Sequence, residues 1–424
     1  MDAFYVSVEL LRRPELRGKP VVVGGTGARG VIAAASYEAR RFGVHSAMPS
    51  STARRVCPHA VFLPGDHERY AEVSAQVHEV FRSVTPFIEP LALDEAFLDV
   101  SGALRLLGEA DEIAHHLRRE VKARTELTCS VGVAPNKFLA KLASVAAKPV
   151  AAPDGVREGK GVVVVRPGEE LAFLHPLPVT ALWGVGPATL ERLTRLGVRT
   201  VRDLAGLDER SLVAALGAAH GRHLYQLAWG KDDRPVEVDR AIKSIGHEET
   251  FATDRDTVEE LRRELTRLAD AVAARLRAHH TGARTLTLKV RFAGFHTITR
   301  SVTLPSPVAT AHSIVEAVMP LLAAIDPSPG VRLLGVSGAN FGEPAEQLTL
   351  TDLLANASGE PNEARPASAA EWQAAELTMD AIRSRFGTTA IGPASAVGAG
   401  GLRPVRKGGQ QWGPDAPGAP PSGA

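Results

Sequence analysis

The sequence predicts a multidomain α/β protein in which an all-helical unit separates two mixed units. Its 424 residues are more than one hydrophobic core usually fills, because single cores stop growing at roughly 250 to 300 residues. Strand-like and helix-like segments alternate over about the first 165 residues and again from 242 to 341. Residues 177–230 instead show short helical segments separated by glycines. These patterns exclude a single compact domain.

One strand and one helix of the first mixed unit have clear patterns of apolar residues. The run from Pro20 to Gly24 is β-branched, as in a buried strand, and the stretch from Glu109 to Arg124 is amphipathic at helical spacing. Gly25, Gly27 and Gly30 satisfy the dinucleotide pattern G-x-G-x-x-G. No helix starts directly after them and no acidic residue stands near position 50, so we interpret this segment as a hairpin loop.

The second mixed unit has the alternation expected of a helix-covered sheet. We expect a helix at 257–278, strands at 284–292 and 297–304, a second helix, and a strand at 331–338. The charged run from 231 to 240 precedes this unit as a linker. Beyond Gly342 the composition shifts to Ala, Gly, Pro and Ser, which predicts a mostly disordered tail over 343–424.

The composition bounds the setting of the protein. The 49 basic and 48 acidic residues nearly cancel, so any attraction to nucleic acid must come from local charge. Cys57 and Cys129 stand far apart without a His cluster, which predicts neither a disulfide framework nor a zinc site. No apolar run reaches the length of a membrane span, and the first residues do not resemble a signal peptide. We expect a cytoplasmic protein.

Two adjacent carboxylates, Asp94 and Glu95, interrupt the apolar run LALDEAFLDV. Burial of a carboxylate is unfavourable unless a cation compensates it, and Mg²⁺ with oxygen ligands is one such cation. Adjacent strand residues point to opposite faces, so both side chains reach one metal cluster only at a turn or a strongly twisted hairpin. From these residues alone, a solvated hairpin tip remains the alternative.

Several segments of this sequence resemble the Y family of DNA polymerases, in the order in which the family carries them. The N-terminal MDAFYVSVE is similar to the family's opening strand, where an aspartate, any residue and a second aspartate precede an aromatic pair. The second carboxylate motif is IEPLALDEAFLDV at 88–100. The further matches are AAASYEARRFGVHSAMP (33–49), SVGVAPNKFLAKLAS (130–144), AKP (147–149), WGVGPATLERLTRLGV (183–198) and KSIGHEETF (243–251).

The resemblance covers about 340 residues and implies a right-hand polymerase of the bacterial DNA polymerase IV type. The mixed α/β palm and small fingers would occupy 1–165, with the fingers at about 11–63. A helical thumb with a helix-hairpin-helix element would follow at 166–232, then a linker at 233–241 and an α/β little finger at 242–342. The implied activity is low-fidelity, lesion-tolerant DNA synthesis by a monomer on primer-template DNA and deoxynucleoside triphosphates.

The resemblance also implies the roles of single residues. Asp94 and Glu95 would hold two Mg²⁺ ions with the backbone carbonyl of Met1, because two divalent ions suit phosphoryl transfer. Tyr5 matches the steric gate that excludes a ribose 2′-hydroxyl, against the alternative of a core tyrosine. The implied nucleotide-binding residues are Phe4, Tyr37, Arg40 and Lys148. Without the resemblance, Arg40 would equally fit a solvated helix face.

DNA contacts are expected from the thumb and the little finger. The implied positions are Gly184, Gly186, Lys243, Lys289, Arg291 and Arg300. Glycines at a helix N-terminus let backbone N–H groups approach a phosphate, although a plain turn would carry the same pattern. Lys289 and Arg291 share one strand face by the period of two, and no acidic residue occurs from 271 to 315.

Near the start of the tail, Gln347, Leu348 and Leu350 resemble the peptide by which such polymerases dock on the sliding clamp. Thr351 stands where the family has an aromatic residue, which weakens the expected affinity.

The sequence departs from the family at the metal site. Asp2 corresponds to the second aspartate of the opening pattern, and the first would precede Met1. Either the start codon is placed too late or part of the metal site is lost, and the survival of the downstream positions favours the first reading. The loop around Lys148 also lacks the usual aspartate before it and glycine after the proline. The rival hypothesis is a catalytically silent adaptor that binds DNA and clamp.

Overall fold

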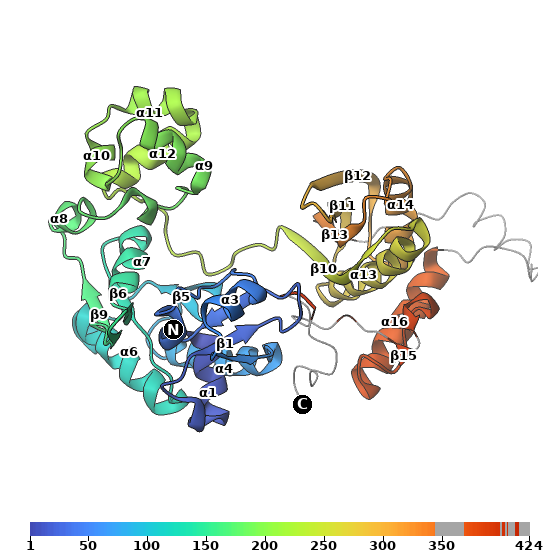
Figure 1. Cartoon of the computed structure of the whole chain (residues 1–424), viewed down its shortest axis with the longest axis horizontal. Helices are drawn as coiled ribbons and strands as arrows, with labels where there is room; N and C mark the ends of the chain where they lie inside the picture. The colour runs from blue at the N-terminus through green and yellow to red at the C-terminus, as the bar shows by residue number, and fades with distance from the viewer. Residues whose placement is uncertain (344–368, 399–400, 403–404, 406–411, 415–424) are drawn as a thin grey trace, which may run out of the picture.

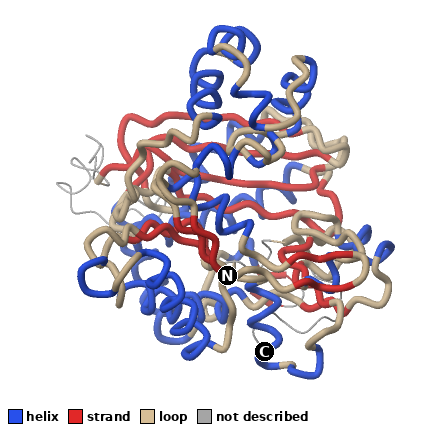
Figure 2. The backbone as a smooth tube through the Cα atoms, turned by 90° about the vertical axis from the view of Figure 1, so that its left-hand side faces the viewer, coloured by secondary structure: helices blue, strands red, loops and turns tan. Residues whose placement is uncertain are grey.

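The computed structural model describes residues 1–343, 369–398, 401–402, 405 and 412–414. Figure 1 shows an N-terminal α/β unit, a separate helical unit around α9 to α12, and a second α/β unit around α13 that an extended linker joins to the rest. Figure 2 shows the strands as sheets covered by helices. Among these described residues, no helix is both long and apolar enough to cross a bilayer.

The N-terminal unit is built on a small three-stranded sheet and three packed helices. Strand β1 lies between β2 and β3, antiparallel to the first and parallel to the second. Helices α1, α4 and α6 enclose the core, which includes Phe4, Val8, Tyr70, Val77 and Val121. The elements are α1 (Phe4–Arg12), η1 (Pro14–Leu16), β1 (Val21–Gly24), β2 (Ile32–Ala35), α2 (Tyr37–Arg40), α3 (Ser50–Val56), β3 (Val61–Leu63), α4 (His67–Arg82), β4 (Ile88–Ala92), β5 (Glu95–Leu98), α5 (Leu104–Leu107), α6 (Ala110–Thr125), β6 (Val131–Val133), α7 (Lys137–Ala146), β7 (Val150–Ala152), β8 (Gly155–Arg157) and β9 (Val162–Val164).

The predicted strand at 20–24 and helix at 109–124 are confirmed as β1 and α6. The glycine-rich segment is confirmed as a hairpin loop, because it joins antiparallel β1 and β2. The expected opening strand is wrong for this segment, because no strand is assigned before β1. The amide of Asp2 donates to Thr128 O at 3.1 Å, and α1 begins at Phe4. Phe4, Val8 and Leu11 recur at helical spacing and face the core, so the periodicity overrides the strand reading.

The helical unit packs around a core of leucines. Its hydrophobic cluster includes Leu193, Leu204, Leu212 and Leu224, and Phe138 of α7 joins it from the N-terminal unit. The elements are α8 (Glu170–Leu174), η2 (Val179–Ala181), α9 (Pro187–Arg195), α10 (Val201–Ala205), α11 (Glu209–Leu216) and α12 (Ala218–Ala228). No strand lies between 177 and 230, as predicted, and the chain then runs without helix or strand to Ser244.

The second α/β unit is an antiparallel four-stranded sheet in the order β10-β13-β11-β12. Helices α13 and α14 cover one face, where Leu286, Leu288 and Val290 are fully buried. The elements are β10 (Ser244–Arg255), α13 (Val258–Ala278), β11 (Gly282–Phe292), β12 (Thr297–Val308), α14 (Ala311–Ala323) and β13 (Val331–Gly342). The predicted helix and three strands are confirmed. Strand β10 was not predicted as a strand, because Glu249 interrupts its apolar alternation.

The expected disorder of the tail is wrong for residues 369–386, which form α16 (Ala369–Phe386) beside α13 and α14 (Figure 1). Ion pairs attach the helix: Arg277 binds Glu376 and Asp380. Glu376 also accepts from the amide of Ala311 at 2.7 Å and so caps α14. Charge pairing rather than an apolar stripe holds α16, which is why the composition did not reveal it.

A buried ionic cluster joins α13 to β10. The two guanidinium nitrogens of Arg267 bind both carboxylate oxygens of Glu249, and Glu264 accepts a further bond at 2.9 Å. Arg267 is 6 % exposed and Glu249 4 %. Burial alone would raise the pKa of Glu249, but the bonds from His247 and Arg267 outweigh it and lower that pKa to about 2. Removal of one member of such a buried, fully bonded group leaves an unpaired buried charge, which is strongly destabilising.

We predict that Glu249→Ala lowers the free energy of unfolding by about 3 to 5 kcal/mol at pH 7, because it strands the Arg267 charge. The folded-state pKa lies below the ordinary 4.5, so the stabilisation is complete above about pH 5 and disappears as pH falls toward 2. Urea unfolding between pH 7 and pH 3 measures both effects. Glu259→Ala removes an exposed carboxylate of α13, and an equal loss in this control would contradict the account.

Candidate active site

The two adjacent carboxylates lie at the turn of a hairpin. Ala92 of β4 pairs with Glu95 of β5, so Leu93 and Asp94 form the two-residue connection. The N-terminal amine of Met1 donates to Asp94 O at 2.8 Å. The turn removes the opposite-face constraint of a regular strand, which is the condition under which both carboxylates can serve one site.

The surroundings shift the pKa values of the two carboxyl groups in opposite directions. Burial is the largest influence on Asp94 and raises its pKa above the ordinary value, with partial opposition from the Met1 amine. Burial also acts on Glu95, but the bond and charge of Lys141 outweigh it and lower that pKa. Asp94 is therefore a half-buried carboxylate that its neighbours compensate incompletely, and an added cation would stabilise it.

Lys148 closes the site from the loop after α7. Its Nζ donates to Met1 O at 3.1 Å, so the loop brings this lysine to the first residue of the chain. Asp2 is 6 % exposed and accepts from Ser130 Oγ at 2.8 Å. Asp2 is thus engaged in a structural bond, while the Met1 carbonyl faces Lys148.

The fingers contribute Tyr37 and Arg40 from the short helix α2. Ser36 caps this helix by accepting from Ala39 N, and Arg40 donates from Nε to Ala35 O at 3.0 Å. The Arg40 guanidinium carbon lies 4.9 Å from the Tyr37 ring centroid. Within the described part of the chain, the buried Tyr37 hydroxyl has no hydrogen-bond partner. Leaving such a group unsatisfied costs about 1 to 3 kcal/mol, so a ligand oxygen would be stabilised here.

Burial and then the negative charge of Asp2 raise the pKa of Tyr37 to about 12. The hydroxyl therefore keeps its proton at neutral pH and can donate to a ligand oxygen.

Tyr5 and Phe4 are neighbours on α1 but point to different places. The Tyr5 ring stacks on Tyr70 with centroids 4.5 Å apart and remains partly exposed, which argues against the core-tyrosine alternative. Tyr70 is itself fixed by a bond from its hydroxyl to Glu9 at 2.7 Å. Phe4 is 3 % exposed inside the core. The expected contact of Phe4 with a nucleotide is therefore wrong for its side chain, because the helix turns that ring inward.

The candidate metal ligands supply the kind of atoms that magnesium binds. Asp94, Glu95 and the Met1 carbonyl supply oxygen atoms, which Mg²⁺ prefers, and the raised pKa of Asp94 marks a carboxylate that lacks full compensation. The residues fit an oxygen-bound cation in these respects. Within the described ranges, however, no three His, Cys, Asp or Glu side chains gather as a metal-binding group.

Lys137 and Lys141 on α7 were missed from the sequence. Lys137 binds Glu89 at 2.6 Å and Lys141 binds Glu95 at 2.5 Å, so the helix holds both strands of the carboxylate hairpin. The signal was available, because lysines four residues apart share one helix face and the two glutamates stand six residues apart on the hairpin.

The expected DNA-binding glycines of the thumb have the geometry of a tight approach. Gly184 has φ +91°, which disfavours other residues, and a Cβ there would meet the His220 ring at 2.8 Å. Gly186 is the N-cap of α9, and nothing lies within 4 Å of where its Cβ would stand. The backbone before α9 is therefore open to a phosphate.

The predicted positive surface of the little finger is only partly realised. Lys289 and Arg291 lie on the sheet face away from the helices, as the alternation predicted. Lys289 is paired with Glu248 at 2.7 Å, which reduces its free charge. Arg300 pairs in register with Leu288, so it lies on the other side of the sheet from Lys289, and its side chain is exposed there. Lys243 is exposed just before β10.

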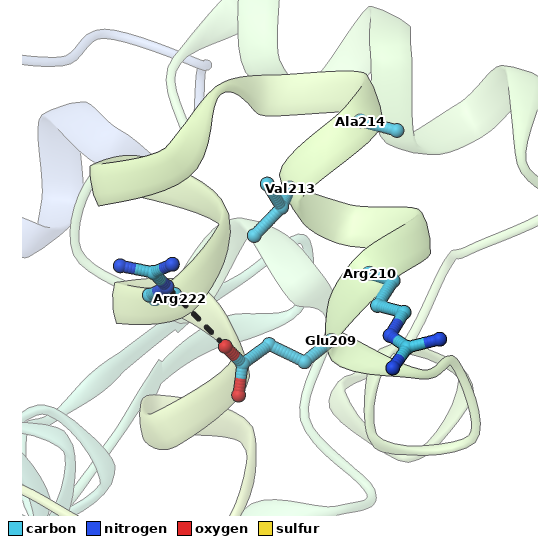
Figure 3. A pocket seen from close by; sticks show the side chains of 5 residues that line it. All are labelled: Glu209, Arg210, Val213, Ala214 and Arg222. Carbon is cyan, nitrogen blue, oxygen red and sulfur yellow. Dashed lines mark ion pairs between the residues drawn. The ribbon is translucent and has the colours of Figure 1, made fainter.

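Two further features stand apart from this site. Gln347, Leu348 and Leu350 lie outside the described residues. A surface pocket on the thumb is lined by α11 and α12, where Arg222 pairs with Glu209 at 3.4 Å (Figure 3). It contains none of the predicted catalytic residues.

We predict that Asp94→Asn raises the melting temperature at pH 7 by about 1 to 3 °C, because burial disfavours the charged carboxylate that it removes. The folded-state pKa lies above the unfolded value, so the gain is largest at neutral pH and vanishes at about pH 3. Asp99 on the same hairpin is the matched control, since bonds from Ser101 lower its pKa. Thermal unfolding of both asparagine variants decides this, and a fall for Asp94→Asn would refute the assignment of unrelieved burial.

Comparison with known proteins places the chain in one family along most of its length. Models of the impB/mucB/samB family match residues 1–145, those of its C-terminal domain match 242–351, and the helix-hairpin-helix motif of the same family matches 167–198. The chain is 42% identical over 400 residues to a DNA polymerase IV of Desulfatibacillum aliphaticivorans, covering 94% of this chain and 95% of the relative. It is 48% identical over 339 residues to one of Halorhodospira halophila, with 80% and 92% covered.

The fold agrees with solved polymerases. A Y-family DNA polymerase chimera of Dbh and Dpo4 superposes with a TM-score of 0.71 at 26% identity, covering 81% of this chain and 97% of the other. An insertion ternary complex of Dbh DNA polymerase gives a TM-score of 0.57 over the same shares. The right-hand arrangement of palm, fingers, thumb and little finger is thereby confirmed. The chain belongs to the impB/mucB/samB family, the Y family of DNA-directed DNA polymerases, with relatives of the bacterial DNA polymerase IV type.

Proposed function

We propose that this protein extends primers past damaged or distorted template positions, with low fidelity, by nucleotidyl transfer that depends on two Mg²⁺ ions. The observation that carries the proposal is the convergence at the β4–β5 turn. Asp94, the Met1 carbonyl and Lys148 are joined there by direct bonds, and Glu95 begins the next strand. Carboxylates, a lysine and a nearby arginine together suit a reaction between a hydroxyl and a triphosphate.

The fingers and Lys148 would hold the triphosphate. Arg40 offers a planar set of donors beside the Tyr37 ring, and the unpartnered Tyr37 hydroxyl offers one more. Lys148, whose Nζ donates to Met1 O, adds a point charge. A phosphate oxygen would satisfy the Tyr37 hydroxyl, which none of the described residues does.

Asp94, Glu95 and the Met1 carbonyl would hold the ions. When bound, the ions lower the pKa of the primer hydroxyl and neutralise charge on the triphosphate and leaving pyrophosphate. Lys141 keeps Glu95 ionised and in place, since it lowers the pKa of that carboxylate. Asp94, with its raised pKa, gains most from a bound cation.

Tyr5 would act as the steric gate. Its ring is fixed against Tyr70 at 4.5 Å, and Tyr70 is anchored by Glu9, so the ring cannot move aside without breaking this stack. A rigid ring beside the sugar would exclude a ribose 2′-hydroxyl and admit a deoxyribose.

DNA would be held by backbone contacts rather than by base recognition. The glycines before α9 can approach one phosphate, and Arg291 with Lys243 can approach others from the little finger. We also propose docking on a sliding clamp through Gln347, Leu348 and Leu350, monomeric action and a cytoplasmic location.

The rival function is a silent adaptor for DNA and clamp. An adaptor has no need for an unpartnered Tyr37 hydroxyl beside Arg40, or for a half-buried, incompletely compensated carboxylate at a turn, since both are unfavourable without a ligand. The site geometry therefore favours the polymerase.

We predict that Asp94→Ala reduces primer extension with Mg²⁺ by at least about 100-fold, because a carboxylate that holds the ions is removed. The assay uses this chain and a version extended upstream by an opening strand that ends in aspartate. Asp99→Ala, on the same hairpin, should retain activity. DNA binding without extension in both backgrounds would eliminate the polymerase and leave the adaptor.

We predict that Tyr5→Ala lowers discrimination against ribonucleotides by about 10- to 200-fold, because the ring no longer occupies the space of the 2′-hydroxyl. Single-nucleotide insertion with paired deoxy- and ribonucleotides measures the ratio of kcat/KM. Tyr225→Ala in the thumb is the control and should leave the ratio unchanged. Unaltered discrimination by Tyr5→Ala would mean that Tyr5 is only a packing residue.

A further inference from the structure

A short piece of the tail, Trp412 to Pro414, lies on the palm and fingers far from its neighbours in sequence. The amide of Val31 donates to Trp412 O at 2.8 Å, and the amide of Gly27 donates to Pro414 O at 3.1 Å. Pro414 is buried and Trp412 partly buried. Two backbone bonds and an aromatic side chain thus attach this piece, which we call the plug segment (residues 412–414), to the loop between β1 and β2.

The surface under the plug segment is shaped by glycines. A side chain at Gly25 would collide with Trp412 O, and one at Gly65 would collide with the indole ring. Gly413 has φ +85° and approaches Arg29 O so closely that its own Cβ would lie 2.6 Å from that oxygen. Three glycines on two sides of one contact are what a close backbone approach requires.

The indole of Trp412 lies against the proposed steric gate. Its ring centroid is 5.4 Å from that of Tyr5 and 6.4 Å from that of Tyr70. His67 lies 6.4 Å from it on another side. An indole is a flat, fused aromatic ring system of about the dimensions of a nucleobase, and bases are bound by stacking on such side chains.

We propose that the plug segment occupies the place of a base of the nascent pair and so competes with nucleotide and template. The proposal rests on the proposed role of Tyr5: a base is bonded to the sugar that Tyr5 would face, so it must lie beside that ring. Trp412 is there already. Substrate must displace it before a pair can form.

The path of the tail is consistent with a built-in competitor. Val405 packs against the little-finger core and Trp412 against the palm core, so described residues of the tail contact both units. The same loop that receives the plug segment also receives the little finger, since Arg29 binds Asp254 at 2.6 Å and the carbonyl of Phe251. A movement of the little finger on DNA would therefore act on the loop and on the plug segment together.

A purely structural strap is the alternative to a competitor. A strap would hold the units together without affecting nucleotide affinity, whereas a competitor raises the apparent dissociation constant by the reciprocal of the unplugged fraction. A segment docked in about 80 to 90% of molecules raises it about 5- to 10-fold. The size of the nucleotide effect therefore separates the two.

The test begins with amide hydrogen exchange on the full chain. In the protein alone, the amides of Gly27 and Val31 should be protected from exchange. The Trp412→Ala substitution should make both amides exchange faster. The matched control is Trp372→Ala, which removes a tail tryptophan that stacks on His312 instead. This part does not depend on catalysis, so it tests the contact even if the chain proves inactive. Equal exchange in all three proteins would overturn the proposal.

The second part measures competition. Addition of primer-template and a non-hydrolysable deoxynucleoside triphosphate should make the same amides exchange faster in the unaltered chain. Trp412→Ala should lower the dissociation constant for that nucleotide about 5- to 10-fold, and a synthetic peptide of residues 403–424 should restore the original value. Protection that persists with substrates bound, or an unchanged dissociation constant, would reduce the plug segment to a strap and contradict the inference.

Discussion

The site depends on one constraint: a carboxylate at a tight turn is held beside the first residue of the chain and is only partly compensated there. The Met1 amine bonds the Asp94 carbonyl, and Lys148 bonds the Met1 carbonyl. The remaining imbalance appears as the raised pKa of Asp94. Other parts of the palm serve to keep this turn in place, since α7 pins both strands of the hairpin through Lys137 and Lys141.

The same physical theme recurs at the fingers and on α1. The Tyr37 hydroxyl is buried without a partner among the described residues, and Tyr5 is held in a stack that leaves it partly exposed. Natural proteins retain unfavourable features of this kind mainly where a ligand relieves them. The plug segment lies at the same site, because the chain's own indole covers the surface beside Tyr5 that would accept a base.

Much of the fold was predictable because its elements follow simple periods. The strand alternation around Lys289 and the helix from 258 to 278 were readable from apolar spacing alone. Asp94, Glu95, Tyr5, Tyr37, Arg40 and Lys148 were predicted as site residues from motifs and remain proposals. The failures arose where charge or tertiary contact decides the structure. Glu249 interrupts the apolar alternation of β10, and α16 is attached by the ion pairs and hydrogen bonds of Glu376. Trp412 carries no local signal, because its partner glycines, Gly25 and Gly65, lie near the other end of the chain.

A crystal structure of the chain with primer-template DNA, a correctly paired deoxynucleoside triphosphate and Ca²⁺ tests the central claim most directly. The account predicts a cation on the Asp94 carboxylate, phosphate oxygens on the Tyr37 hydroxyl, Arg40 and Lys148, and the sugar against Tyr5, with Trp412 displaced. A nucleotide bound elsewhere, with the Tyr37 hydroxyl still unpartnered and no cation at Asp94, would contradict it.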